Sequence, residues 1–113
     1  MFALLALVAT LSLGTADNGK SFTLPPKTAV VVTLPSNAST GYHWTPREMS
    51  KGVVRLVSHR YVQPKNRPPG APGKEKWRFV AVGAGSVHLR LDYVGPSDPY
   101  KPARRFGVTI RVR

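Results

Sequence analysis

Cysteine is absent from the 113-residue sequence, and acidic residues are scarce, with only five Asp and Glu. The lack of cysteine excludes a disulfide scaffold, a cysteine zinc site, an iron–sulfur centre and thiol catalysis. A small domain without disulfides must be held by its own hydrophobic core. Two Trp, four Tyr and four Phe make such a core feasible.

Signals for catalysis and metal binding are also missing. The three histidines, His43, His59 and His88, lie on different predicted strands and have no obvious carboxylate partner. Five acidic residues leave little material for a paired-carboxylate site. The sequence has no HExxH motif, no phosphate-cradling glycine loop and no histidine pair with metal-ligand spacing. We therefore predict that the protein is not an enzyme, has no catalytic residue, and holds no metal or cofactor.

Only one long apolar run occurs, from Phe2 to Leu13, and small residues follow it up to Ala16. Twelve residues are too few for a membrane span, which needs about 20, but they suit the apolar region of a secretory signal peptide. No Lys or Arg precedes the run, and a buried first strand or helix is the alternative. We predict a signal peptide over residues 1–16, one domain over residues 17–113, and a secreted or periplasmic location.

Positive charge dominates the remainder, because 17 Lys and Arg give a net charge of +12. Such a charge implies solubility and attraction to anionic partners. The cations are spread along the chain, and the aromatic residues Trp44, Trp77, Phe79 and Phe106 occupy positions that suit a core. Nucleic-acid binding would instead need clustered cations with exposed aromatics. We expect no specific nucleic-acid partner, only weak, salt-sensitive polyanion binding.

Several stretches alternate apolar and polar residues with period two, which is typical of half-buried strands. No apolar pattern after Ala16 has helical spacing, and eleven Pro and ten Gly separate the stretches. The pattern predicts an all-β fold, an immunoglobulin-like antiparallel β-sandwich of about seven strands. The strands are expected at 21–24, 27–34, 42–45, 53–62, 74–82, 86–93 and 104–113.

Three long loops are predicted to share one end of the sandwich. If each strand runs opposite to the preceding one, the loops 35–41, 63–73 and 94–103 meet at the same end. Long loops grouped on a rigid scaffold commonly carry binding function. Tolerated insertions are the alternative explanation.

The segment Asn37–Tyr42 predicts a stiff polar turn. Asn37 can bond its own backbone, Ser39 and Thr40 supply hydroxyl groups, and Gly41 permits a positive φ angle. Tyr42 and Trp44 share one face of the following strand and would anchor the turn to the core. An ordinary turn is the alternative reading.

This segment, Asn-Ala-Ser-Thr-Gly-Tyr, resembles the Asn-Pro-Thr-Thr-Gly-Tyr loop of the chagasin-type inhibitors of papain-like cysteine peptidases. Two further family motifs have counterparts in the same order. Gly70-Ala71-Pro72-Gly73 occupies the position of the family's Gly-x-Gly-Gly motif. Residues 93–97 occupy the position of the family's Tyr-x-Arg-Pro-Trp motif. An aromatic-led last strand, at Phe106, completes the resemblance, which covers essentially all of residues 17–113.

The resemblance implies an immunoglobulin-like monomer that inhibits a papain-like cysteine peptidase reversibly. Three loops would form a wedge in which the loop around Thr40 lies against the catalytic cysteine, while the other two grip the rims of the cleft. The residues implied to contact the peptidase are Asn37, Ala38, Ser39, Thr40, Gly41, Tyr42, Gly70, Ala71, Pro72, Gly73, Gly95, Pro96 and Ser97.

The chain departs from the family pattern in each of the three motifs. Ala38 and Ser39 are mild changes, and Pro72 stiffens its loop, whereas Gly95 and Ser97 replace the Arg and Trp types that most often anchor interfaces. The alternative function is a non-inhibitory secreted β-sandwich that binds an anionic partner through its basic face.

Overall fold

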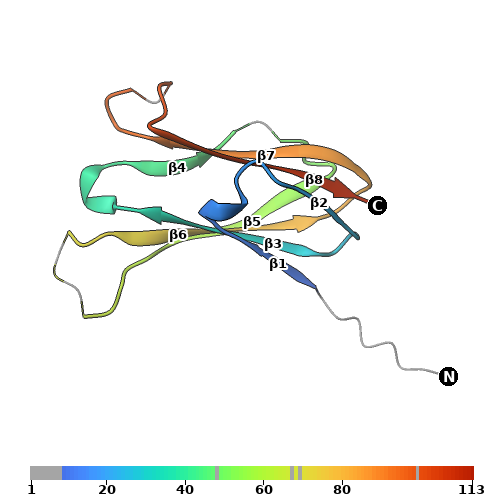
Figure 1. Ribbon diagram of the computed structural model, residues 1–113, viewed down its shortest axis with the longest axis horizontal. Helices are drawn as coiled ribbons and strands as arrows, with labels where there is room; N and C mark the ends of the chain where they lie inside the picture. Colours follow the sequence, from blue (N-terminus) through green and yellow to red (C-terminus); the bar gives the residue numbers. More distant parts are fainter. Residues whose placement is uncertain (1–8, 48, 67, 69, 99) are drawn as a thin grey trace.

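Eight strands and two short 3-10 helices make up the fold in the computed structural model, which describes residues 9–47, 49–66, 68, 70–98 and 100–113. The immunoglobulin-like all-β fold predicted from the sequence is confirmed (Figure 1). The elements in chain order are β1 (Thr10–Leu13), η1 (Thr15–Asp17), β2 (Ser21–Leu24), β3 (Ala29–Ser36), η2 (Ala38–Thr40), β4 (His43–Pro46), β5 (Val54–Val62), β6 (Gly73–Ala81), β7 (Gly85–Val94) and β8 (Arg104–Val112).

The strands form two four-stranded sheets, which lie as two layers in Figure 1. One sheet has the order β1-β3-β6-β5 and the other the order β2-β8-β7-β4. The architecture differs from the expected seven antiparallel strands in two respects. It has an additional strand, β1, and both sheets are mixed, because β1 runs parallel to β3 and β2 runs parallel to β8.

The period-two alternation of the sequence becomes the core between the sheets. On β8, Phe106, Val108 and Ile110 point inward and pair in register with Leu91, Leu89 and Val87 of β7. The four aromatic residues assigned to the core from the sequence are all buried, namely Trp44, Trp77, Phe79 and Phe106. Each fully buried large apolar side chain stabilises the fold by roughly 1.5–3 kcal/mol, which makes disulfides unnecessary.

Strand β1 lies inside the segment that the sequence predicts to be a signal peptide. Thr10–Leu13 pairs with residues 29–32 of β3, and the Leu13 side chain is only 4% exposed. Residues 1–8, which hold most of the apolar run, lie outside the described residues. Removal of residues 1–16 stays a prediction, and it would take β1 away from its sheet. No helix among the described residues has the length and apolarity needed to cross a membrane.

The strand registers place the exits of β3, β5 and β7 at one pole of the sandwich. Ser36 at the end of β3 pairs with Gly73, and His43 at the start of β4 pairs with Val94. Tyr93 pairs with Arg104, so β7 turns into β8 at the same pole. The predicted grouping of the three long loops is therefore confirmed, and all three lie at the left in Figure 1.

Candidate functional site

Three loops separated in sequence meet at this pole. We define them by the strand ends as loop 1 (residues 37–42), loop 2 (residues 63–72) and loop 3 (residues 95–103). Loop 1 starts two residues later than predicted, because Pro35 and Ser36 still pair with β6. Loop 1 lies between the other two in Figure 1.

Loop 1 is a compact polar turn held by its own hydrogen bonds. The Asn37 carboxamide oxygen accepts bonds from the Ser39 amide at 3.1 Å and the Ser39 hydroxyl at 2.6 Å. The Thr40 hydroxyl donates to the Asn37 carbonyl at 2.7 Å, and Gly41 ends the turn with φ 79°. Ala38, Ser39 and Thr40 are exposed. The loop therefore presents a stiff tip, as the turn residues predicted.

Both neighbouring loops contact loop 1. The Asn37 side-chain amide donates to the Gly70 carbonyl of loop 2 at 3.3 Å. On the other side, a Cβ atom added to Gly41 would lie 3.2 Å from Pro96 of loop 3, and one added to Gly95 would lie 2.7 Å from the Tyr42 ring. Glycine is thus required at two of these close approaches, and the three motifs form one continuous surface.

A stack of aromatic rings supports loop 1 from the core side. The Tyr93 ring lies 5.4 Å from the Tyr42 ring and 4.9 Å from the Trp44 ring, centroid to centroid. The Tyr93 hydroxyl accepts the Asn37 amide at 3.1 Å, and the Trp44 indole donates to the Pro35 carbonyl at 3.0 Å. These bonds tie the start of loop 1 to both sheets, since Pro35 is on β3 and Tyr93 on β7.

A buried carboxylate joins the two ends of loop 1. Glu75 of β6 is 2% exposed, and its Oε2 accepts from the Ser36 hydroxyl at 2.6 Å and from the Trp44 amide at 3.0 Å. Ser36 precedes loop 1 and Trp44 follows it closely. The other oxygen, Oε1, lies 2.9 Å from His59 Nε2 on β5. Glu75 therefore fixes the spacing between the two strands that carry loop 1.

The His59–Glu75 pair corrects the prediction that no histidine has a carboxylate partner. The pairing is not visible in the sequence because it depends on the register of β5 against β6, across 16 residues. The carboxylate stands between Ser36 and His59, so no histidine can take a proton from the hydroxyl as in a catalytic triad. Among the described residues, no group of three or more His, Asp or Glu side chains is placed to hold a metal ion.

Two of the thirteen residues singled out from the sequence are buried. Gly73 belongs to β6, where an added Cβ would lie 2.5 Å from the Val62 carbonyl oxygen, and Gly95 lies beneath the Tyr42 ring. These two glycines shape the loops from inside. The remaining eleven are exposed or half-buried, and their contact with a peptidase stays a prediction. Glu75, Ser36 and Tyr93, which the sequence analysis did not assign to the site, support it.

The profile of a family described as "Chagasin family peptidase inhibitor I42" matches residues 23–112. The chain belongs to the chagasin family. As a member of a peptidase-inhibitor family it is not an enzyme, as predicted. Among curated proteins, chagasin of Trypanosoma cruzi is 29% identical over 101 residues, which cover 85% of this chain and 92% of chagasin.

Two solved structures have the same fold as this chain. The cysteine protease inhibitor EhICP2 from Entamoeba histolytica superposes with a TM-score of 0.81 at 20% identity, covering 93% of this chain and 96% of EhICP2. PbICP-C, solved in complex with falcipain-2, superposes with a TM-score of 0.69 at 15% identity, covering 93% of this chain and 99% of PbICP-C. The eight-stranded sandwich is therefore the fold of this chagasin-type inhibitor.

Proposed function

We propose that the protein is a reversible inhibitor of papain-like cysteine peptidases that fills the active-site cleft with loops 1, 2 and 3. The observation that carries this proposal is the convergence of the three loops at one pole, joined by the Asn37–Gly70 bond and the Gly41–Pro96 approach. Membership of the chagasin family supports it, as does the fold shared with EhICP2, which is described as a cysteine protease inhibitor, and with PbICP-C, which was solved in complex with falcipain-2.

The proposed inhibition is occupation of the cleft without chemistry. Loop 1 enters first, with Thr40 against the catalytic cysteine. The tip is curled into a 3-10 turn by bonds from Thr40 and Gly41 amides to the carbonyls three residues earlier, each 3.2 Å long. A curled backbone does not offer a carbonyl in the attack geometry that cleavage requires. The peptidase is blocked and the inhibitor stays intact.

Affinity would come from preorganisation more than from large anchors. The bonds within loop 1 and the clamp by Glu75 reduce the entropy lost on association. Ser97 stands where the family motif has Trp, a residue type that is often worth about 2 kcal/mol or more at an interface. We therefore expect binding about 30-fold weaker than that of a relative with the complete motif.

Gly41 and Gly19 form a matched pair for the test. Both have positive φ angles, 79° and 85°, so alanine strains the backbone at each. An alanine Cβ at position 41 would press on Pro96, whereas the one at position 19 meets nothing within 4 Å. Gly19 lies in the turn before β2, where its amide bonds the Gly107 carbonyl, outside the three loops.

Titration of papain with the purified protein and the two variants tests the proposal. At papain concentrations well above the dissociation constant, the wild type should abolish hydrolysis at a 1:1 molar ratio. The Gly19→Ala variant should inhibit equally well. The Gly41→Ala variant should bind at least about tenfold more weakly, because loop 1 can no longer seat against loop 3. Equal inhibition by both variants, or none by the wild type, would show that loop 1 is not the inhibitory element.

We also propose that the apolar N-terminal run directs the protein to a secreted or periplasmic location and that it acts as a monomer. The apolar character of residues 2–13 supports export, and the high net charge of +12 disfavours self-association. N-terminal sequencing of the protein recovered from culture medium or periplasm tests this, and recovery only from the cytoplasm would contradict it.

A further inference from the structure

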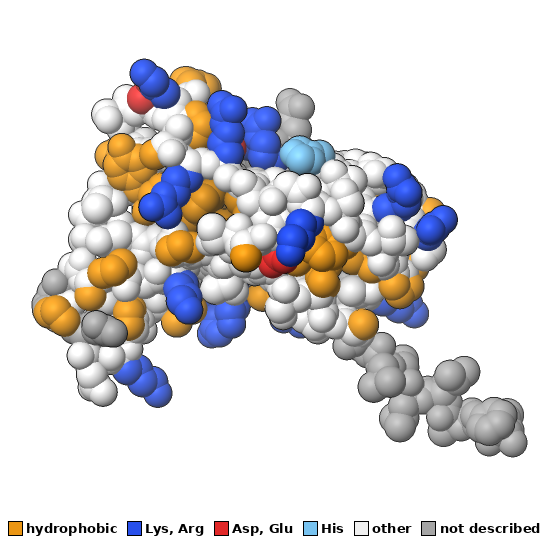
Figure 2. All heavy atoms as spheres, viewed as in Figure 1, with side chains coloured by type: hydrophobic (Ala, Val, Ile, Leu, Met, Phe, Trp, Pro, Cys, Tyr) orange, Lys and Arg blue, Asp and Glu red, His pale blue; other side chains and the backbone are white. Residues whose placement is uncertain are grey.

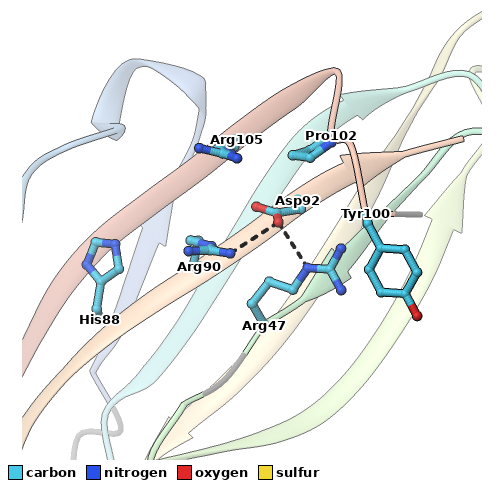
Figure 3. A pocket seen from close by; sticks show the side chains of 7 residues that line it. All are labelled: Arg47, His88, Arg90, Asp92, Tyr100, Pro102 and Arg105. Atoms are coloured by element: carbon cyan, nitrogen blue, oxygen red, sulfur yellow. Dashed lines mark hydrogen bonds and ion pairs between the residues drawn. The ribbon is translucent and has the colours of Figure 1, made fainter. Parts of the chain in front are cut away.

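A basic hollow lies on the outer face of β7 and β8, behind loop 3. Its volume is about 590 Å³, and Figure 3 shows the side chains that surround it. They come from β7, β8, loop 3 and the residue after β4, and include Arg47, His88, Arg90, Asp92, Tyr100 and Arg105. None of the thirteen residues predicted to contact a peptidase lines this hollow, although Tyr100 belongs to loop 3, so the hollow adjoins the proposed inhibitory pole without including those residues.

Asp92 organises the positive charges around the hollow. It is 2% exposed, and its Oδ2 accepts from Arg47 Nε at 2.9 Å and from Arg90 Nη2 at 3.4 Å. Arginine remains charged at any pH that a folded protein meets. Among the described residues that line the hollow, three guanidinium groups therefore accompany a single carboxylate, that of Asp92.

Arg90 and Arg105 are positioned to receive an oxyanion. The Arg90 side chain is 44% exposed and uses one nitrogen for Asp92. Arg105 pairs with Asp92 in the strand register but makes no side-chain hydrogen bond or ion pair with any described residue. Both side chains lie beside Asp92 in Figure 3, Arg90 on β7 and Arg105 on β8. Guanidinium groups bind carboxylate and sulfate through paired N–H bonds, which are among the strong charge-assisted kind.

The positive charge continues along the sheet beyond the hollow. Arg111 faces outward from β8 like Arg105, six residues further on, which is about 20 Å along a strand. Lys and Arg side chains stand along the upper edge of the molecule in Figure 2, over β7 and β8. Two cationic positions about 20 Å apart on β8, those of Arg105 and Arg111, suit an extended chain of anions better than a single small ion.

We propose that this basic hollow binds an acidic polysaccharide, with one sulfate or carboxylate group held by Arg90 and Arg105. The hollow offers a single exposed aromatic ring, Tyr100 at 90% exposure, whereas single-stranded nucleic acids need several rings on which successive bases stack. Asp92 Oδ1 has no hydrogen-bond partner among the described residues. A ligand that carries hydroxyl donors beside its anionic groups, as a polysaccharide does, would match this acceptor, whereas a carboxylate side chain of a protein partner has only acceptors.

The test compares two double variants that remove the same charge from opposite faces. Arg90→Gln with Arg105→Gln empties the hollow, while Lys76→Gln with Arg78→Gln neutralises two cations of β6 in the other sheet. Heparin is the probe, and its affinity is measured calorimetrically at about 0.15 M salt. The hollow variant should bind at least about tenfold more weakly and the β6 variant less than about threefold. Tyr100→Ala, which leaves the charge unchanged, should also weaken binding about threefold.

Each result decides the matter. Equal losses in the two double variants would mean that heparin senses net charge alone, and no heparin binding by the wild type would end the proposal. A single-stranded DNA oligonucleotide is run in parallel, and a loss for DNA as large as for heparin would overturn the choice of polysaccharide. Both double variants should inhibit papain like the wild type. Impaired inhibition by the hollow variant alone would assign the hollow to the peptidase interface instead.

Discussion

At the scale of single residues, Glu75 is the side chain on which the geometry of loop 1 depends most. One carboxylate oxygen receives both the Ser36 hydroxyl and the Trp44 amide, so the two strands that carry loop 1 are held at a defined separation. Hydrogen bonds to a buried charged group are stronger than neutral ones, and removing one partner leaves costly unpaired groups. The stiffness of the tip of loop 1 and the stability of the fold therefore both depend on Glu75.

Glu75→Gln should weaken the inhibition of papain by about tenfold, mainly through faster dissociation. Gln keeps one oxygen that can accept from Ser36 and Trp44 but loses the negative charge, so the charge-assisted bonds at the base of loop 1 become weaker neutral ones. The unfolding free energy should also fall by about 1–3 kcal/mol. Stopped-flow dissociation kinetics and urea unfolding measure the two effects.

Asp92→Asn provides the control, because Asp92 is equally buried but lies away from loop 1. This variant should lose stability without changing the dissociation rate. If both variants dissociate from papain at the wild-type rate, the clamp at Glu75 does not determine inhibition.

Single substitutions in loop 3 provide a second prediction for papain inhibition at the scale of residues. Ser97 is exposed, and Ser97→Trp should tighten papain inhibition by up to about 30-fold by restoring an aromatic anchor. Gly95→Arg should have the opposite effect, since even a Cβ at that position would lie 2.7 Å from the Tyr42 ring and displace it. Inhibition constants of the two single variants check this, and tighter inhibition by Gly95→Arg would contradict the packing described for Tyr42.

The residue-scale predictions made from the sequence succeeded where the determining pattern is local. Alternation along a strand was enough to predict that Trp44, Trp77 and Phe106 are buried. The turn-forming residue types were enough to predict the roles of Asn37 and Gly41 in loop 1. The Glu75 network was missed because its partners come from three other strands. A charged residue at an inward position of a strand pattern is the signal that was available in the sequence.

At the scale of elements, the seven predicted strands are all present, with ends that differ by up to two residues. The parallel pairing of β1 with β3 and of β2 with β8 was not predicted. Short strands of four residues carry little periodic signal, and their partners lie far away in sequence, so pairing direction is decided by packing against the rest of the sheet. Strand β1 was also masked by its resemblance to the end of a signal peptide.

Truncation tests whether the N-terminal segment is needed for the fold, as strand β1, in addition to its predicted role as a signal peptide. A chain starting at residue 9 keeps all of β1, while one starting at residue 17 loses its pairing with β3 and the buried Leu13. We expect the shorter chain to be less stable by about 3 kcal/mol, from lost apolar burial and backbone bonds. Urea unfolding of both chains measures the difference. Equal stability would show that β1 is dispensable and that cleavage after Ala16 leaves a complete domain.

At the scale of the whole molecule, the uncharged tip of loop 1 and the basic outer faces of the sheets are different surfaces, which adjoin at loop 3. The tip of loop 1, residues 37–42, carries no charge, whereas the outer faces of both sheets carry rows of Lys and Arg. Alternation and the assumption of reversing strands were sufficient to predict that three loops share a pole. Sequence alone did not reveal that these loops touch one another, because that depends on how closely the sheets pack.

This separation predicts different salt responses. Raising the salt concentration from about 0.05 to 0.5 M should weaken heparin binding by well over tenfold, because counterions compete for the cations. Papain inhibition should change by less than about threefold, since uncharged loop residues are expected to make the central contacts. Calorimetry with heparin and steady-state inhibition across the same salt series test this. A steep salt dependence of inhibition would mean that charge, and not the loop wedge, drives peptidase binding.

The most direct test of the central claim is the pattern of inhibition against substrate concentration. Papain hydrolysis of a small fluorogenic peptide is measured across a grid of inhibitor and substrate concentrations. If the three loops occupy the cleft, the apparent inhibition constant rises in proportion to substrate, with complete inhibition at saturation. An inhibition constant that does not change with substrate, or full peptidase activity at micromolar excess of the protein, would contradict the account.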